Sequence, residues 1–214
     1  MAALYAETDQ YAKSDRLELR SVVARASEFG LDHADAAWLL ATLGVLEYRR
    51  ARYADAERDQ NAALAISEKV APNGPATSQI LNNLGLIQLR TRRYAEALSS
   101  FRRPAAVGEA AMNPDYPMQA LLLANLGTTH LLLNGPTEAE PFYTRALALA
   151  ENRIGTEHPL VGRILSCYAV VLRQTNRKGQ AKDIERHAKA IVQEHSRETF
   201  SQMVINVGDI LARP

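Results

Sequence analysis

The sequence predicts an all-α solenoid of helix pairs, because a pattern recurs along the chain every 41 to 42 residues. Three registers share this period. The first register holds Gly44, Gly85, Gly127 and Ala169. The second register lies twelve residues later, at Ala56, Ala97, Ala139 and Ala181. The third lies ten residues before the first, at Ala34, Pro75, Pro117 and Pro159. Self-similarity at a fixed period of about 20 to 50 residues is the signature of a repeat architecture.

Each repeat predicts two helices joined by a short turn and followed by a longer loop. In the second repeat, Ile80, Leu81, Leu84 and Ile87 recur at three- and four-residue spacing, which is typical of an amphipathic helix. The expected pairs are 35–50 with 53–70, 76–90 with 94–111, 118–133 with 137–152, and 160–175 with 179–195. A lone helix over 14–29 brings the expected total to about nine helices.

The expected domain organisation follows from these elements. It consists of an N-terminal segment (1–13), a half repeat (14–33), four repeats over 34–195 (about 35–75, 76–117, 118–159 and 160–195), and a tail (196–214). A repeat array needs its last apolar face covered, so we expect the tail to cap it or to dock on a partner.

Pro104 lies in the middle of the helix expected over 94–111. Proline removes one backbone hydrogen bond and clashes with the preceding turn, at a cost of about 3 kcal/mol if uncompensated. We therefore expect a kink or a helix break near residues 101–103.

Composition excludes several classes of function. The formal net charge of +1 gives no global attraction to nucleic acid or to an anionic membrane surface. Cys167 is the only cysteine, so no intrachain disulfide forms. The N-terminus has no basic start followed by an apolar run, and no stretch approaches the ~18 apolar residues of a membrane span. We expect a cytoplasmic protein with a protein or peptide partner, without nucleic acid, membrane or cofactor.

The third repeat carries Leu126, Gly127, Ala139, Tyr143 and Ala146, and these residues resemble the tetratricopeptide repeat. The 42-residue period and the phrases Leu-Asn-Asn-Leu-Gly (81–85) and Gly-Thr-Glu-His-Pro (155–159) are similar to the kinesin light chain type. The other repeats depart from the pattern, with Gln60 and Glu185 in place of the aromatic residue and Pro104 in place of the last alanine. The resemblance covers roughly residues 14–195 and implies a right-handed superhelix of antiparallel helix pairs, without enzymatic activity.

The resemblance also places the first helix of each repeat along a concave groove. Among the 24 groove positions of the four repeats there are four arginines and no acid, so we expect these arginines to lack opposing acids. Asparagine offers a donor and an acceptor to an extended main chain, and arginine grips a carboxylate with two hydrogen bonds. The expected groove residues are Trp38, Tyr48, Arg49, Gln79, Asn82, Asn83, Leu86, Arg90, Asn125, Thr128, Arg163, Ser166 and Arg173.

These residues favour a protein–protein interaction module that binds an extended, acidic peptide segment. In a plainer interpretation, Asn83 and Asn125 bond neighbouring helices and the arginines are solvated. The alternative function is a structural scaffold that self-associates or packs as an accessory domain of a larger assembly. The sequence leaves the oligomeric state open.

The sequence gives weaker support for other kinds of site. His187 and His195 are eight residues apart, close to one helical face, but no third metal ligand is evident. Cys167 has no phased histidine and is expected to be a small packed residue. His33 and His158 occupy equivalent loops and are expected to be structural. We find no catalytic constellation and no phosphate-binding loop.

Overall fold

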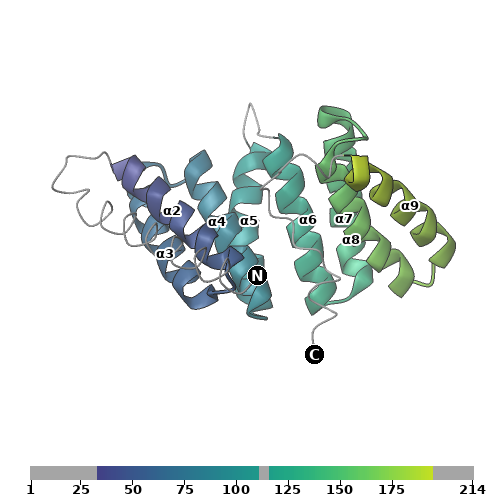
Figure 1. Cartoon of the computed structure of the whole chain (residues 1–214), viewed down its shortest axis with the longest axis horizontal. Coiled ribbons are helices and arrows are strands. Elements are labelled where there is room, and N and C mark those ends of the chain that lie inside the picture. The colour runs from purple at the N-terminus through teal and green to yellow at the C-terminus, as the bar shows by residue number, and fades with distance from the viewer. Residues whose placement is uncertain (1–32, 111–115, 195–214) are drawn as a thin grey trace, which may run out of the picture. The chain divides into compact units, whose positions relative to one another are not determined.

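The computed structural model describes residues 33–110 and 116–194, and within these residues it is entirely helical apart from short turns (Figure 1). No strand occurs in these two ranges. The helices are α2 (His33–Arg49), α3 (Tyr53–Val70), α4 (Pro75–Arg90), α5 (Tyr94–Ala110), α6 (Tyr116–Leu133), α7 (Pro136–Ile154), α8 (Pro159–Gln174) and α9 (Lys178–Glu194). The all-α class is therefore confirmed. The lone helix expected over 14–29 and the capping role of the tail fall outside the described residues.

The chain divides into two compact units, one ending at Ile87 and the other beginning at Gln88, and each is described by itself. In the first unit, α2 packs along α3. Ala63 of α3 meets Ile80 and Leu84 of α4 in a small apolar cluster, against which Leu40 of α2 also packs.

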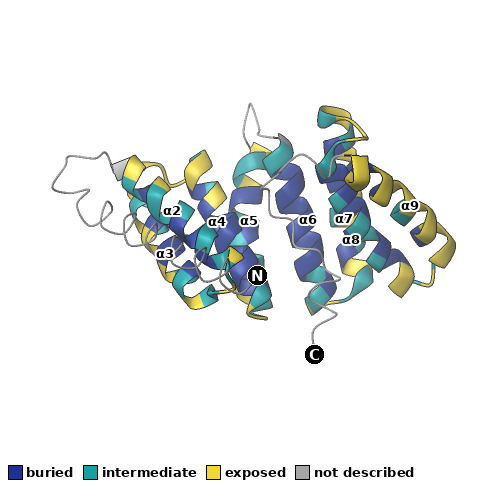
Figure 2. Ribbon diagram, in the orientation of Figure 1, coloured by how far each residue is buried: buried dark blue, intermediate teal, exposed yellow. Residues whose placement is uncertain are grey.

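In the second unit, α6 pairs with α7 and α8 pairs with α9, while α5 packs on α6 and α7 on α8. Residues 119–129 of α6 are all buried, which Figure 2 shows as an almost continuous dark blue helix. One apolar cluster joins α6, α7, α8 and α9 through residues that include Leu121, Tyr143, Ile164 and Ile191. This continuous core holds α6, α7, α8 and α9 together.

The small residues of the repeat registers lie where two helices touch. The four alanines of the second register are buried, with at most 1% of their surface exposed: Ala56, Ala97, Ala139 and Ala181. A Cβ atom added at Gly127 would lie 3.1 Å from the ring of Tyr143 on α7, and one at Gly44 would lie 2.7 Å from Nε2 of Gln60 on α3. A larger side chain at either position would push the paired helices apart.

The turn between the two helices of a pair follows a common geometry in the first, second and fourth repeats. Ala51, Arg92 and Asn176 adopt left-handed backbone conformations, with φ of 59°, 62° and 63°. The next amide then donates to the carbonyl five residues earlier, as in Arg52 to Glu47 (2.9 Å), Arg93 to Gln88 (2.8 Å) and Arg177 to Leu172 (2.8 Å). These bonds satisfy carbonyl groups that the helix end would otherwise leave open.

Of the kink or helix break expected near residues 101–103, the break does not occur, because α5 runs from Tyr94 to Ala110 with Pro104 inside it. The proline removes one hydrogen bond, the one its amide would donate to the carbonyl of Ser100. Pro104 is also buried beside Phe101, which is fully buried, so the ring gains packing where the backbone loses a bond.

Candidate functional site

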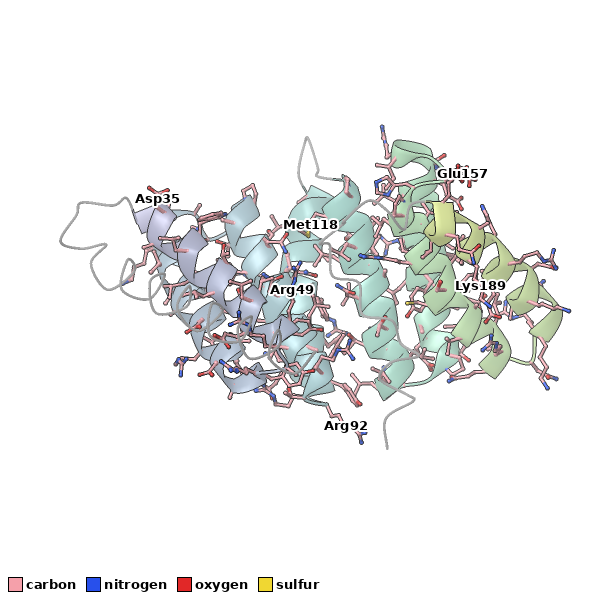
Figure 3. The ribbon with its side chains drawn as sticks, viewed as in Figure 1. Asp35, Arg49, Arg92, Met118, Glu157 and Lys189 are labelled. Atoms are coloured by element: carbon pink, nitrogen blue, oxygen red, sulfur yellow. The ribbon has the colours of Figure 1, made fainter. Side chains whose placement is uncertain are left out.

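A stripe of four residues follows one face of α2, and we call it the α2 stripe: Trp38, Thr42, Val45 and Arg49. Their spacing of four, three and four residues keeps them in line on a helix. Trp38 is 67% exposed and Arg49 is exposed, whereas Thr42 and Val45 are half-buried. Trp38 and Arg49 are eleven residues apart, which corresponds to about 16 Å along the helix axis. The stripe thus carries a large exposed aromatic ring and an exposed cation, Arg49, which Figure 3 labels.

Several of the expected groove positions of the first unit contact neighbouring groups of the chain. Thr42 Oγ1 donates to the carbonyl of Trp38 at 2.9 Å. Tyr48 is half-buried and meets Tyr53 edge to face, with ring centroids 5.7 Å apart. On α4, the exposed Gln79 donates from Nε2 to Oδ1 of Asn83 at 3.1 Å.

A second stripe lies on α8 in the second unit, and we call it the α8 stripe: Arg163, Ser166, Val170 and Arg173. Arg163 is half-buried, and this burial lowers the pKa of its guanidinium group. Ser166 Oγ donates to the carbonyl of Gly162 at 2.9 Å. Arg173 is exposed and forms an ion pair with Glu185 of α9. The expectation that the groove arginines lack opposing acids is therefore wrong for Arg173.

Five of the thirteen expected groove residues are buried, with at most 4% of their surface exposed: Asn82, Asn83, Leu86, Asn125 and Thr128. The hydroxyl of Thr128 shares a hydrogen bond of 2.8 Å with the hydroxyl of Tyr143 on α7. Arg90, in the last turn of α4, is half-buried. A buried side chain has to be uncovered before it contacts a partner, so the accessible part of the expected groove lies chiefly on α2 and α8.

One polar cluster of the second unit was not predicted from the sequence. Arg177, in the turn before α9, donates two hydrogen bonds to Glu140 of α7, at 2.7 and 2.6 Å. Tyr168 of α8 donates a third to Glu140 at 2.8 Å. The hydrogen bonds from Arg177 lower the pKa of Glu140, and burial together with the Glu140 carboxylate raises the pKa of Tyr168. Glu140 and Arg177 are 37 residues apart, so no local spacing reveals the pair.

The remaining candidates have structural roles or stay untested. Cys167 is buried in the core, as expected of a small packed residue. His158 accepts a hydrogen bond at Nδ1 from the amide of Leu160 at 3.1 Å, which caps the N-terminus of α8. Within residues 33–110 and 116–194, no three His, Cys, Asp or Glu side chains gather as metal ligands. His187 lies 3.3 Å from Glu157, and His195 falls outside the described residues.

Comparison with protein families identifies the class of protein. The family model described as the tetratricopeptide repeat matches three overlapping segments, residues 43–105, 76–152 and 120–194. These segments together span well over half of the chain, and the chain belongs to the tetratricopeptide repeat family. Members of this family are generally protein–protein interaction modules rather than enzymes.

Solved structures place the fold closer to one branch of this family. BtubC (BKLC) from P. vanneervenii has a TM-score of 0.74 at 21% identity, over 95% of this chain and 81% of that chain. A putative kinesin light chain from Podosopora anserina, with nearly identical TPR-like repeats, has a TM-score of 0.67 at 14% identity, over 92% and 94%. At these identities the likeness establishes a kinesin light chain-like repeat fold.

No curated protein sequence matches the chain significantly. Among the helices that the structure describes, none is long and apolar enough to cross a membrane.

Proposed function

We propose that this chain is a cytoplasmic protein–protein interaction module whose first helices bind an extended, acidic segment of a partner. The observation that carries the proposal is the α2 stripe, which presents an exposed tryptophan and an exposed arginine on one face and contains no acid. The α8 stripe has the same character, with arginine at both ends and no acid along it.

The chemistry of the α2 stripe sets the kind of segment that would bind. Trp38 offers a large apolar surface for an aromatic or aliphatic anchor residue, and such aromatic contacts dominate many interfaces. Arg49 offers planar donors that suit a carboxylate. An extended strand advances about 3.3 Å per residue, so the ~16 Å between them corresponds to about five residues of the partner.

The α8 stripe contributes less charge. Glu185 already neutralises much of Arg173, so a partner carboxylate would have to displace it. Arg163 is half-buried, so less of its guanidinium group is accessible to a partner. We therefore assign peptide binding to the α2 stripe of the first unit and regard the α8 stripe of the second unit, taken by itself, as the weaker candidate.

Selection from a random peptide library, followed by fluorescence anisotropy on the selected peptides, tests this proposal. We expect acidic segments with an aromatic or aliphatic anchor to be enriched. Trp38→Ala and Arg49→Glu should each weaken their binding. Arg102→Glu is the matched control, because Arg102 is exposed on the second helix α5 and the substitution changes the net charge equally.

Two outcomes would overturn the proposal. One is equal enrichment of basic and acidic peptides, and the other is an equal loss of affinity in the Arg49 and Arg102 variants. Light scattering over a range of protein concentrations then examines the scaffold alternative, for which mass should rise with concentration.

A further inference from the structure

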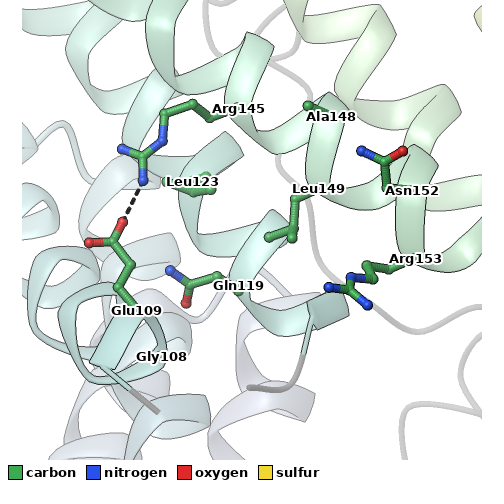
Figure 4. Close-up of a pocket in the computed structure, with 9 residues that line it drawn as sticks. All are labelled: Gly108, Glu109, Gln119, Leu123, Arg145, Ala148, Leu149, Asn152 and Arg153. Carbon is green, nitrogen blue, oxygen red and sulfur yellow. Dashed lines mark hydrogen bonds and ion pairs between the residues drawn. The ribbon is translucent and has the colours of Figure 1, made fainter. Parts of the chain in front are cut away.

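The second unit contains a hollow of about 610 Å³ between α5, α6 and α7 (Figure 4). None of its lining residues belongs to the expected groove positions or to the two stripes. Its volume lies within the ~300 to 1,000 Å³ that is usual for small-molecule sites. The hollow is therefore a separate place where a ligand has room to bind.

The floor of the hollow is apolar and held in place by packing. Leu123 of α6 is buried and Leu149 of α7 is half-buried. Gln119 is buried beside them and donates from Nε2 to the carbonyl of Ala105 at 3.0 Å. A Cβ atom at Gly108 would overlap Oε1 of this glutamine, so the glycine lets Gln119 lie against α5.

The rim of the hollow is polar and charged. Arg145 and Arg153 project from α7, and Glu109 from α5 is the single acid among the lining residues that the structure describes. Arg145 Nη2 lies 2.7 Å from Glu109 Oε1, as the dashed line in Figure 4 marks. Glu109 thus holds the guanidinium group of Arg145 at the rim of the hollow.

Glu109 can be replaced as the ion-pair partner of Arg145. The two side chains are 58% and 49% exposed, and exposed ion pairs of this kind contribute little to stability. A carboxylate from outside can therefore take the place of Glu109 at Arg145 without unfolding the helix pairs. Glu109 then turns into solvent, where its charge is hydrated.

We infer that this hollow binds a small carboxylate with an aliphatic or aromatic body. The body lies on Leu123 and Leu149, and the carboxylate pairs with Arg145 in place of Glu109. The charge of Arg145 favours an anionic ligand over a neutral one of the same shape. This site is independent of peptide binding on the α2 stripe.

Titration with phenylbutyrate, followed by amide chemical shifts in two-dimensional NMR spectra of the full chain, tests this inference. Phenylbutyramide is the matched neutral probe. We expect phenylbutyrate to shift the signals of Gly108, Leu123 and Leu149, and to bind more tightly than the amide. Arg145→Gln should weaken phenylbutyrate about two- to fivefold, as expected for an exposed charge pair.

Glu109→Gln gives the sharper test, because it removes the competing carboxylate and should strengthen phenylbutyrate binding while leaving the amide unchanged. Trp38→Ala should alter neither probe. Three results would overturn the inference: equal affinities for the two probes, weaker phenylbutyrate binding in the Glu109 variant, or no shifts at the hollow up to the solubility limit of the probe.

Discussion

The hydroxyl groups of Thr128 and Tyr143 share a hydrogen bond of 2.8 Å in the interior of the second unit, where both residues are 0% exposed. Tyr143 is the aromatic residue of the third repeat's tetratricopeptide pattern, and its ring also fills the space above Gly127. Burial raises the pKa of Tyr143 well above its ordinary value, so the phenol stays neutral. One tyrosine thus fixes the α6–α7 pair through both packing and a polar contact.

We expect Tyr143→Phe to lower the free energy of unfolding by about 1 to 2 kcal/mol, because the buried hydroxyl of Thr128 loses its partner. Denaturant unfolding measures this change. The double variant with Thr128→Val removes both polar groups, so it should be less destabilised than the two single effects added together. Additive losses would show that the two hydroxyl groups are not coupled.

Gly127→Leu should be damaging, because the added side chain starts 3.1 Å from the ring of Tyr143. Overpacking a helix contact typically costs about 1 to 3 kcal/mol. Gly179→Leu is the control, since a Cβ atom there meets nothing within 4 Å and the residue is exposed on α9. If thermal unfolding gave the same midpoint for both variants, close contact at Gly127 would not matter to stability.

Much of this fold is visible in the sequence because each repeat carries its own boundary residues. The helix expected over 53–70 matches α3 (Tyr53–Val70), and the prolines of the third register mark the starts of α4 at Pro75 and α8 at Pro159. Proline is favoured in the first turn, where its missing amide has no helical partner. The small residues that recur at the helix contacts then show the length of the repeat.

What the sequence did not reveal depends on how one helix pair meets the next. The burial of Asn83 and Asn125 is set by neighbouring helices, and the periodicity of one repeat does not contain that information. The ion pair of Arg173 with Glu185 likewise joins two helices. Counting the charges along one helix face does not include a partner on the next helix. Among the expected groove residues, Trp38 and Arg49 of α2 are exposed.

The cluster of Glu140 with Arg177 predicts a pH dependence of stability. Because Arg177 lowers the pKa of Glu140 in the folded state, the contribution of this carboxylate is complete above its unfolded pKa of about 4.3. It declines as the pH falls through the lowered folded pKa, where both states become protonated. We expect Glu140→Gln to be less stable than wild type at neutral pH, with the difference shrinking in acid.

Urea unfolding of both proteins between neutral and acidic pH measures that difference. Glu138→Gln is the matched control on α7, because Glu138 is exposed in the first turn. A gap between wild type and the Glu140 variant that stayed constant with pH would exclude a titrating role for this carboxylate.

The α2 stripe predicts a preferred spacing within its peptide ligand. An anchor residue on Trp38 and a carboxylate on Arg49 should lie about five residues apart, because an extended chain covers ~16 Å in that length. In a peptide series with one aromatic residue and one aspartate, affinity measured by anisotropy should be highest near this spacing. Rising salt should weaken the best peptide most, since exposed charge pairs are screened within ~8 to 10 Å at physiological ionic strength.

In Arg49→Gln the spacing preference should disappear while a weaker affinity for the aromatic residue remains. A series with equal affinity at every spacing in the wild-type protein would mean that the two residues do not act on one peptide.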